Sequence, residues 1–341
     1  MVYFIIVIYM KKMKYILKRL KNLEWRQFID VVKKIAKKTN RSKIVIFFDC
    51  IWCGFRYGAG YMDYFEFEFY LLKGKERKTY LTSTINNKII AKYNDKQYTK
   101  VFKDKILFNQ TFKEYIHRDF IDLQKSSFEE FQTFLKGKEK IIGKVIDECG
   151  GKGIKIYEQK DYKAEELYQE LRKNKQYLVE ECITQHEKMN SLYAKSVNSL
   201  RMISFIRDDG EVEILNTVLR IGNGGEVDNF SSGGMYTFVG LDGKVLIPAI
   251  DEKGHIYEYH PISNTKISGF QIPDFETVIK YVKVLAKVEP HVRYVGWDIA
   301  VTKDGVDVIE GNEYSGVFQM KPSISHKKEG LLPLYKKYMD I

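Results

Sequence analysis

Near the C-terminus, one segment has the sequence pattern of a β-hairpin, and its register constrains what this chain can fold into. Two β-rich runs, at residues 295–301 and 306–309, flank the tripeptide Lys303-Asp304-Gly305. This tripeptide suits a three-residue loop with Gly305 in the left-handed conformation, which closes an antiparallel pair of strands. The sequence therefore predicts a hairpin with a fixed pairing of its two strands.

Three oxygen-bearing side chains meet in that register. Asp298 lies directly opposite Glu310, and Asn312 shares their face because side chains alternate along a strand. Two carboxylates and an amide oxygen suit a hard cation such as Mg²⁺, with substrate phosphates as the remaining ligands. A two-residue Asp-Gly turn would shift the register by one and move Asp298 to the other face. A hairpin with solvated acids is the alternative.

Size and cysteine content indicate a globular enzyme in a reducing compartment. The chain has 341 residues, of which 44% are apolar and 14% aromatic, enough for a substantial core and two or three subdomains. Its four cysteines occur without a secretory signal, so we expect a cytoplasmic protein. Cys50 and Cys53 have the spacing of a redox or half-zinc motif, but no second pair or suitably spaced His accompanies them. We interpret them as structural.

The positive charge is concentrated at the N-terminus. Residues 1–43 hold 13 Lys or Arg and two acids, while the remainder holds 43 of each. The first ten residues are apolar but too few to span a bilayer, which needs roughly 20. From Tyr15 onward, apolar residues recur at mostly helical spacing between lysines, at Leu17, Leu20, Phe28, Val31, Val32 and Ile35.

Such a basic amphipathic helix has three interpretations. It could lie on the anionic inner face of the cell membrane, where each Lys or Arg contributes about 1 kcal/mol. It could instead pack on the protein body through its apolar stripe. Nucleic acid ranks last, because the rest of the chain is neutral and has no recognition motif. We therefore expect peripheral membrane contact through residues 1–43 or internal packing, and no nucleic-acid partner.

The remaining pattern is mixed. Residues 41–104 include an aromatic stretch at 61–70 that suits the edge of a core. Helices are predicted at residues 14–40, 105–115, 126–135, 163–174 and 274–288, and strands at 141–146, 154–158, 177–183, 200–207, 211–221 and 236–239.

A glycine-rich loop joins two of the predicted strands. Gly150, Gly151 and Gly153 expose backbone N–H groups that can approach phosphate oxygens, and Lys144 lies on the strand before them. This is not a Walker motif, and a plain glycine-rich hairpin is the alternative.

A second acidic motif ends the strand at residues 177–183. Glu180 and Glu181 can accept hydrogen bonds from an adenine amino group or a ribose hydroxyl, unless they are ordinary surface glutamates. His186 could orient a hydroxyl, although a single His beside a strand end is more often structural.

The order of these motifs resembles the ATP-grasp superfamily. The segments QHEKMNSLYAKSVNSLRMIS, VDNFSSGG, GWDIA and IEGN look like the sugar-transfer-associated ATP-grasp family, which includes proteins tied to capsular polysaccharide and teichuronopeptide synthesis. The resemblance implies an α+β fold in which two subdomains grip ATP, preceded by a basic helical N-terminal segment. It implies four regions: a basic segment at 1–43, a pre-ATP-grasp region at 44–104, a lid subdomain at 105–181 and a C-terminal subdomain at 182–341.

The resemblance also implies residue roles. ATP phosphates would contact Lys105 and Lys144 under a closing loop of Gly150, Gly151 and Gly153, and adenine would lie between Glu180 and Glu181. Mg²⁺ would be held by Asp298, Glu310 and Asn312. The transferred phosphate would face Arg201 and, as a weaker candidate, Arg220. This chain departs from the family at Lys155, which would share the phosphate role, and at Glu187, where relatives often have proline. The polar loop with Asp228, Asn229, Gly233 and Gly234 suits a mobile lid or substrate binding, and we expect substrate binding because the loop directly follows Arg220.

The reaction expected from this resemblance is ATP-dependent ligation of a carboxylate to an amine through an acyl phosphate, with ATP and Mg²⁺ as cofactors. The substrate would be a small molecule or glycan-linked, in cell-surface or capsular polysaccharide synthesis. A sugar kinase of the same fold and a non-catalytic nucleotide-binding scaffold at the membrane are the alternatives.

Overall fold

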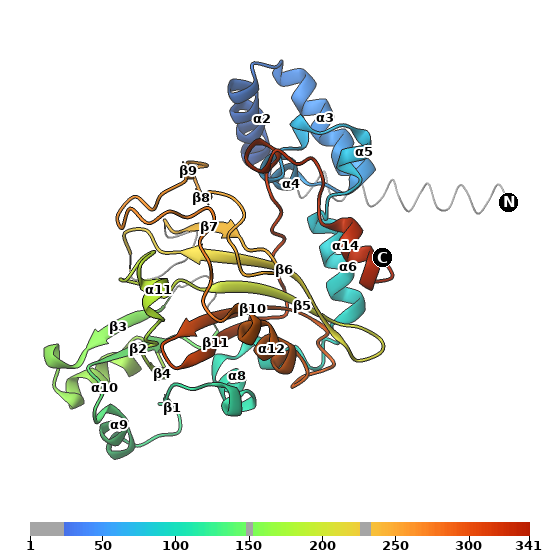
Figure 1. The fold of residues 1–341 in the computed structure, drawn as a ribbon. Helices are drawn as coiled ribbons and strands as arrows, with labels where there is room; N and C mark the ends of the chain where they lie inside the picture. The colour runs from blue at the N-terminus through green and yellow to red at the C-terminus, as the bar shows by residue number, and fades with distance from the viewer. Residues whose placement is uncertain (1–23, 148–152, 226–232) are drawn as a thin grey trace. The chain divides into compact units, whose positions relative to one another are not determined.

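The computed structural model describes residues 24–147, 153–225 and 233–341 (Figure 1). The chain forms two compact units, one of residues 1–88 with 319–341 and one of residues 89–318. The four regions predicted from the sequence were defined by their expected roles and not by how the chain packs, so they stay a prediction. Within the described residues, none of the helices is both long and apolar enough to cross a membrane.

The described part of the first unit is helical. It contains α2 (Trp25–Thr39), α3 (Lys43–Tyr57), α4 (Tyr61–Glu66), the short 3₁₀ helix η1 (Phe69–Leu71), α5 (Gly74–Arg77), the start of α6 (Ser83–Tyr93), α13 (Pro322–Ser325) and α14 (Leu332–Tyr338). The amphipathic helix predicted at residues 14–40 is confirmed from Trp25 onward, and its apolar positions Phe28, Val31, Val32 and Ile35 are buried. Leu17 and Leu20 lie outside the described residues.

The aromatic stretch at residues 61–70 packs into the core of this unit, as predicted. Tyr64 and Phe69 are almost completely buried, and the Tyr64 hydroxyl donates to Asp49 at 2.6 Å. Asp49 is also held by both terminal nitrogens of Arg77, at 2.7 and 2.6 Å. Cys50 and Cys53 are free and buried on the inner face of α3, and burial raises the pKa of the Cys53 thiol to about 12, which makes a reactive thiolate unfavourable.

The C-terminal segment completes the first unit. The Gln319 side chain accepts from the Leu81 N–H at 3.0 Å and donates to the Leu81 carbonyl at 2.7 Å. It thus satisfies both backbone groups of Leu81, as the backbone of a neighbouring β-strand would. Gly330 packs so closely that a Cβ there would lie 2.5 Å from the Tyr80 Cα and 2.7 Å from the Thr79 carbonyl oxygen. Because these are backbone atoms, they cannot move aside without shifting the chain.

We therefore expect Gly330→Ala to lower the free energy of unfolding by about 1–3 kcal/mol, the usual effect of overpacking. Chemical denaturation monitored by circular dichroism measures the change. Gly54→Ala is the matched control, because a Cβ on this α3 residue meets its nearest atom at an ordinary 3.5 Å. The control should match or exceed wild-type stability, since alanine favours a helix by up to about 1 kcal/mol. Equal stability of the two variants would contradict the tight packing at Gly330.

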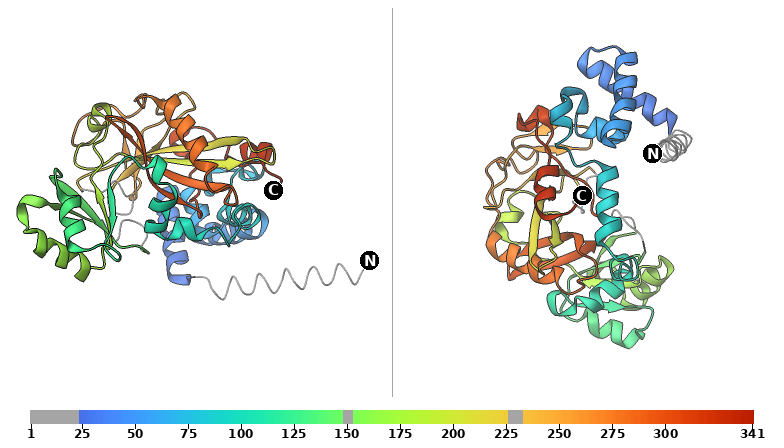
Figure 2. Two further views of the ribbon diagram at one scale, coloured as in Figure 1. Left: turned by 90° about the horizontal axis from the view of Figure 1, so that it is seen from below. Right: turned by 90° about the vertical axis from the view of Figure 1, so that its right-hand side faces the viewer.

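The second unit contains two antiparallel sheets (Figures 1 and 2). The smaller has the order β1-β4-β2-β3, from β1 (Phe120–Asp122), β2 (Lys140–Lys144), β3 (Lys155–Glu158) and β4 (Leu178–Glu181). One face packs on α9 (Phe128–Leu135) and α10 (Ala164–Lys173) around Phe131, Ile141, Tyr157, Leu171 and Val179. Its other face carries Ile142, Lys144, Ile156 and Glu180.

The larger sheet has the order β11-β10-β5-β6-β7-β8-β9. Its strands are β5 (Leu200–Ile206), β6 (Val212–Ile221), β7 (Met235–Phe238), β8 (Ala249–Asp251), β9 (Ile256–Tyr257), β10 (Tyr294–Thr302) and β11 (Gly305–Asn312). One face packs on α8 (Lys105–Thr111) and α12 (Phe275–Ala286). Shorter elements are α7 (Lys100–Lys103), η2 (Lys113–Tyr115), η3 (Gln159–Asp161) and α11 (Glu187–Asn190).

The predicted strands and helices of this unit are confirmed to within a few residues. The sequence did not reveal β1, β8 or β9, which have two or three residues each. Such strands are too short to show alternation. The region at 41–104, expected to be mixed, contains helices and one isolated β-bridge at Asn94 within its described length.

The C-terminal hairpin has the predicted pairing for a different reason. Asp298 lies opposite Glu310, as predicted, but Thr302 pairs with Gly305, so the loop has two residues instead of three. That loop alone would misalign the acids by one position. A β-bulge after Asp298 leaves Ile309 as an extra residue on β11 and restores the register. Gly305 has a positive φ of 139°, but it belongs to the strand rather than to the loop.

Candidate functional site

Four charged side chains cross one face of the larger sheet. Glu310 on β11 pairs in register with Asp298 on β10, and Asp298 pairs with Arg201 on β5. Arg220 on β6 lies two residues beyond Val218, the partner of Arg201, and therefore shares this face. Two acids and two arginines thus lie side by side on adjacent strands. We call these four residues the charge row.

Asp298 is held at the centre of the charge row. Its two carboxylate oxygens accept from Arg201 Nε at 2.5 Å and from an Arg201 terminal nitrogen at 2.8 Å. Arg220 donates to the second oxygen at 3.1 Å. Burial opposes ionisation of this carboxyl, but the two guanidinium groups outweigh burial and hold the pKa of Asp298 below its ordinary value.

Glu310 is affected in the opposite direction. Burial and then the negative charge of Asp298 raise the pKa of Glu310 above its ordinary value. Asn312 donates to Glu310 Oε1 at 3.2 Å and to the Gly296 carbonyl at 3.3 Å, which leaves its amide oxygen as the remaining polar atom. The predicted trio of Asp298, Glu310 and Asn312 is therefore brought together.

Gly296 makes room for the arginine of this row. A Cβ at this position would lie 3.2 Å from a terminal nitrogen of Arg201 and 3.0 Å from the Ser315 Cβ. These contacts are tighter than most Cβ contacts, so Arg201 or Ser315 would have to shift by a few tenths of an ångström to admit a larger residue. The glycine of the GWDIA segment thus has a steric role in placing Arg201.

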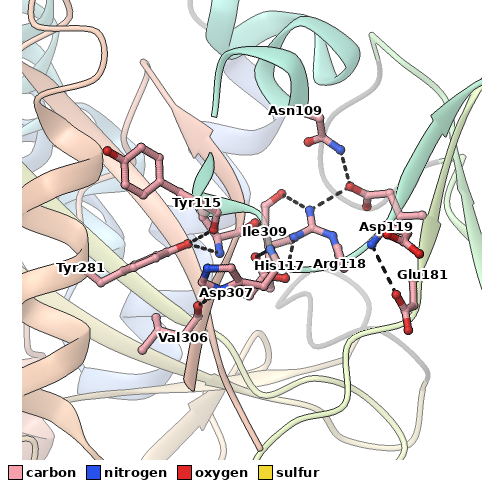
Figure 3. Close-up of polar contacts among 12 residues, drawn as sticks. Asn109, Tyr115, His117, Arg118, Asp119, Glu181, Tyr281, Val306, Asp307 and Ile309 are labelled. Atoms are coloured by element: carbon pink, nitrogen blue, oxygen red, sulfur yellow. Dashed lines mark hydrogen bonds and ion pairs between the residues drawn. The ribbon is translucent and has the colours of Figure 1, made fainter. Parts of the chain in front are cut away.

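A buried ion network joins the larger sheet to the smaller one (Figure 3). Arg118 donates to Glu180 of β4 at 2.8 Å and to Asp307 of β11 at 2.9 Å. It also donates to the Val308 carbonyl at 2.7 Å. The side chains of Arg118, Glu180 and Asp307 are 4%, 1% and 3% exposed, so the three charges are almost fully removed from water.

Further polar contacts extend this network. Lys144 forms an ion pair with Glu180, and Asn109 donates to Glu180 at 2.6 Å. The His117 backbone donates to Asp307 at 3.2 Å (Figure 3). Burial alone would raise the pKa of Glu180, but the positive charges of Arg118 and Lys144 lower it to about 2.

A cavity of about 570 Å³ lies beside this network. Its walls come from β2, β3, the chain leaving β4 and the segment at residues 190–197. Ile309, the bulged residue of β11, also lines it, so the bulge exposes an apolar side chain to the cavity while its neighbour Glu310 faces Asp298. The cavity thus reaches the strand that carries the charge row.

Gln185 holds one cavity wall in place. Its amide nitrogen donates to the carbonyls of Tyr193 and Ser196 at 2.9 and 2.7 Å, and its oxygen accepts from the Asn198 backbone at 2.9 Å. Lys195 lies on this wall, is exposed, and has no ion-pair partner among the described residues. Neither Gln185 nor Lys195 was singled out in the sequence, because neither occurs in a spacing that indicates a site.

The predicted nucleotide-binding lysines have different surroundings. Lys144 lines the cavity but is buried against Glu180, and Lys105 donates to the Ile146 carbonyl at 3.3 Å, at the base of the glycine-rich loop. Lys155 is not brought to the cavity. Its side chain lies on the helix-covered face of β3 and pairs with Glu170 at 2.7 Å.

The glutamates and the histidine predicted at the adenine and ribose also differ from expectation. The Glu180 carboxylate is committed to Arg118 and Lys144, and Glu181 accepts from the Asp119 N–H at 3.3 Å (Figure 3). His186 does not line the cavity. It caps α11, where its Nδ1 accepts from the Lys188 N–H at 3.0 Å.

The two glycine-containing loops are described in part. Gly150, Gly151, Asp228 and Asn229 lie outside the described residues. Gly153 and Gly233 have positive φ values of 70° and 95°, which glycine adopts without strain. Gly234 is buried just before β7.

The donor atoms of the site determine which cation it could bind. Among the described residues, no group of three or more His, Cys, Asp or Glu side chains is placed to hold a metal ion. Asp298 and Glu310 provide two carboxylates, and Asn312 an amide oxygen, so ligands from a substrate are needed to complete a shell. The site fits a cation that arrives with bound phosphates.

A family model described as sugar-transfer associated ATP-grasp matches residues 84–334. The chain belongs to this ATP-grasp family. The family and the α+β fold with a preceding helical segment, both predicted from the sequence, are thereby confirmed. No curated protein matches the chain.

Several solved structures are similar at low identity. An ADP complex of N5-carboxyaminoimidazole ribonucleotide synthetase is 11% identical over 64% of this chain and 47% of its own, with a TM-score of 0.40. The ATP-grasp ligase PsnB with its precursor peptide and AMPPNP is 15% identical over 77% and 68%, with 0.42. D-alanyl-alanine synthetase A from Vibrio cholerae is 11% identical over 71% and 62%, with 0.39. The chain thus spans about half the length of the first, and the family assignment depends on the family model.

The buried network predicts how stability depends on pH. Because the pKa of Glu180 is about 2 in the folded protein and ordinarily 4.5, its ionised form stabilises the fold above pH 4.5. This contribution, on the order of 3 kcal/mol, is lost as the pH falls from 4.5 towards 2. We expect Glu180→Gln to remove that part of the pH dependence, because glutamine does not titrate.

Urea denaturation at a series of pH values measures this effect. At neutral pH the same variant should be less stable by about 3–5 kcal/mol, since Arg118 and Lys144 lose a buried partner. The exposed Glu114→Gln is the control and should follow the wild-type curve. A Glu180→Gln curve parallel to wild type between pH 5 and 2 would show that Glu180 is not held ionised.

Proposed function

We propose that the protein is an ATP-dependent ligase that joins a carboxylate to an amine through an acyl phosphate. The observation that carries the proposal is the charge row, in which two acids suited to a metal ion adjoin two arginines suited to a phosphoryl group. The row lies next to a cavity large enough for a nucleoside. An electrostatic site of this kind is what phosphoryl transfer requires, because the protein's main task there is to position and neutralise charge.

The nucleotide would occupy the cavity between the two sheets. Residues 182–184, which follow the last paired residue of β4, would meet the adenine through their backbone, since both glutamate side chains are engaged elsewhere. Lys144 and Lys195 line the cavity and would face the phosphates, and Lys105 would act from the base of the glycine-rich loop. Lys155 and His186 have no place in this arrangement.

Asp298, Glu310 and Asn312 would hold Mg²⁺. The ion would neutralise the β- and γ-phosphate oxygens as the transferred group leaves ADP. Arg201 and Arg220, now bound to Asp298, would turn their donors to the transferred phosphoryl group and to the carboxylate that receives it. The two arginines would therefore bind Asp298 when no substrate is present and the reacting group when substrate is bound.

The reaction balances with ATP as the energy source. A substrate carboxylate oxygen attacks the γ-phosphorus, the bond to the β–γ bridging oxygen breaks, and ADP leaves. A neutral amine then attacks the acyl carbon and expels inorganic phosphate, and the proton lost by the amine passes to water. Closure of the site over the acyl phosphate would limit its hydrolysis.

The family supports a role in surface-polysaccharide synthesis, with a sugar-linked carboxylate or amine as substrate. The loop at residues 222–234 would contact that substrate, with Asp228, Asn229, Gly233 and Gly234 as its polar and conformationally free positions. We further propose that the reaction takes place in the cytoplasm.

Trapping the acyl phosphate tests the proposal. The protein is incubated with Mg·ATP, hydroxylamine and a panel of uronic acids, nucleotide-linked uronic acids and amino acids, and hydroxamates are detected by mass spectrometry. A hydroxamate formed together with ADP and phosphate supports a ligase. ADP with the phosphate retained on a sugar hydroxyl would instead identify a kinase, and no ADP from any member of the panel would favour a non-catalytic nucleotide-binding protein.

We expect Glu310→Gln to lose most turnover with little change in melting temperature. The variant keeps the shape of the side chain and removes one metal ligand charge, while Glu310 itself forms no ion pair with any other described residue. Asp298→Asn should lose activity and also stability, because it weakens a buried ion pair with Arg201. Asp304→Asn, on the exposed hairpin loop, is the control. Full turnover in Glu310→Gln would remove the metal site from the proposal.

The charge row also predicts that metal and nucleotide bind together. Its two acids and two arginines sum to zero charge, or to a positive charge when Glu310 is protonated, so free Mg²⁺ gains little there. Mg·ATP is negatively charged overall and carries its own phosphate ligands. We expect Mg·ATP to raise the melting temperature by several degrees and Mg²⁺ alone to leave it unchanged. An equal rise with Mg²⁺ alone would contradict this electrostatic balance.

A further inference from the structure

Helix α3 of the first unit is apolar on two faces. Its inner face buries Ile46, Cys50 and Cys53 in the core of the unit. Its outer face carries five large apolar side chains that stay in contact with solvent: Ile44, Val45, Phe48, Trp52 and Phe55 are 69%, 61%, 64%, 57% and 45% exposed. A helix that is apolar all round is normally buried on all sides. We call these five residues the outer face of α3.

The spacing of the outer face makes it one continuous surface. Val45, Phe48, Trp52 and Phe55 follow one another at intervals of three, four and three residues, which places them along one side of an α-helix. At about 100° per residue, the five residues of the outer face cover an arc of roughly 100°. The charged residues of α3 are Lys43, Asp49 and Arg56, and none of them falls inside this arc.

The charge around the outer face is positive. Residues 24–57 contain eight Lys or Arg and three acids. Lys43 and Arg56 stand at the two ends of α3, while its one acid, Asp49, is neutralised by the bidentate contact with Arg77. An apolar aromatic strip with basic ends is the composition of a helix that lies in the interface of an anionic bilayer.

The concentration of exposed apolar residues is local. Trp25, Ile29 and Met62 of the same unit are also exposed. In the second unit, five of the exposed large apolar residues lie in loops and short strands at residues 241–262, so they do not form one face of a helix. Isolated exposed apolar residues need no explanation, but a contiguous strip rimmed by polar residues marks a contact surface.

We propose that the outer face of α3 inserts into the headgroup region of a membrane that contains anionic phospholipids. Phe48, Trp52 and Phe55 would enter the acyl boundary, while Lys43 and Arg56 meet the lipid phosphates. This proposal does not depend on the ligase activity. It also relocates the contact expected from residues 1–43, because the apolar stripe of α2 that suggested it is buried within the protein from Phe28 to Ile35.

A bilayer fits this face better than a protein partner does. The outer face is the convex side of a single helix rather than a groove, so it suits a soft, flat surface. Its aromatic residues include a tryptophan, which favours the bilayer interface because its ring is apolar and its N–H is polar. A second copy of the chain would bring its own Lys43 and Arg56 to the same face, and like charges would oppose the pairing.

Vesicle flotation of the full chain tests the proposal. Wild type should bind vesicles of phosphatidylglycerol mixed with phosphatidylcholine at low salt and bind pure phosphatidylcholine weakly. The double variant Phe48→Asp/Trp52→Asp should lose at least about tenfold in partitioning, because two aromatic contacts are removed and charge repulsion is added. Leu241→Asp, an equally polar change at an exposed apolar residue of the second unit, should bind as wild type does. Melting curves confirm that the variants are folded.

A spectroscopic test gives an independent result. The chain has three tryptophans, and Trp297 is buried, so Trp25→Phe leaves Trp52 as the exposed one. Its emission should shift to shorter wavelength with anionic vesicles. The proposal is overturned if wild type ignores the vesicles, if the double variant still binds, or if sedimentation velocity shows that the face joins two copies of the chain. Loss of binding on deletion of residues 1–23, with binding retained in the double variant, would also overturn it.

Discussion

The arrangement of the second unit depends on one buried arginine. Arg118 lies between Glu180 of the smaller sheet and Asp307 of the larger one, at 2.8 and 2.9 Å. Removing three charges from water is costly, and short contacts offset that cost: both terminal nitrogens of Arg118 donate to carboxylates, and Lys144 forms an ion pair with Glu180. A pair of neutral side chains could hold two sheets together at many relative positions. The fixed geometry of a guanidinium group permits few, and the cavity between the sheets depends on that choice.

The charge row is a second electrostatic arrangement, and we expect it to respond to a ligand differently from the Arg118 network. The Arg118 side chain is 4% exposed and already holds two carboxylates. Arg201 and Arg220 are bound to Asp298, and burial together with the negative charge of Asp298 raises the pKa of Glu310. We expect the contacts of Arg118 to stay the same when a ligand binds, whereas an anionic ligand could redistribute the contacts of the charge row.

The sequence predicted the elements of the second unit and the face shared by Asp298, Glu310 and Asn312, because long strands and helices have clear periodicity. It predicted the loop of the hairpin wrongly. The two-residue loop and the bulge at Ile309 each shift the strand register by one residue, in opposite directions, so Asp298 still pairs with Glu310. No local sequence pattern reveals the bulge. Arg118 and Asp307 escaped notice because they are 189 residues apart and belong to no motif. Lys144 and Glu180 line the same cavity, and their role at a nucleotide stays a prediction. Their ion pair could not be predicted, because it depends on how two separate strands pair in the folded sheet.

The return of the C-terminal segment to the first unit affects the order in which the chain folds. The second unit is one continuous stretch and is complete once residue 318 has been synthesised. The first unit includes helices before residue 88 but needs Gln319 to satisfy the backbone of Leu81, and Gly330 to fill the space beside Tyr80. On the ribosome, the segment around residues 79–81 must therefore wait until residues 319–330 have been synthesised. During that interval its helices would expose apolar surface, a period in which chaperones or an early membrane contact would protect the nascent chain.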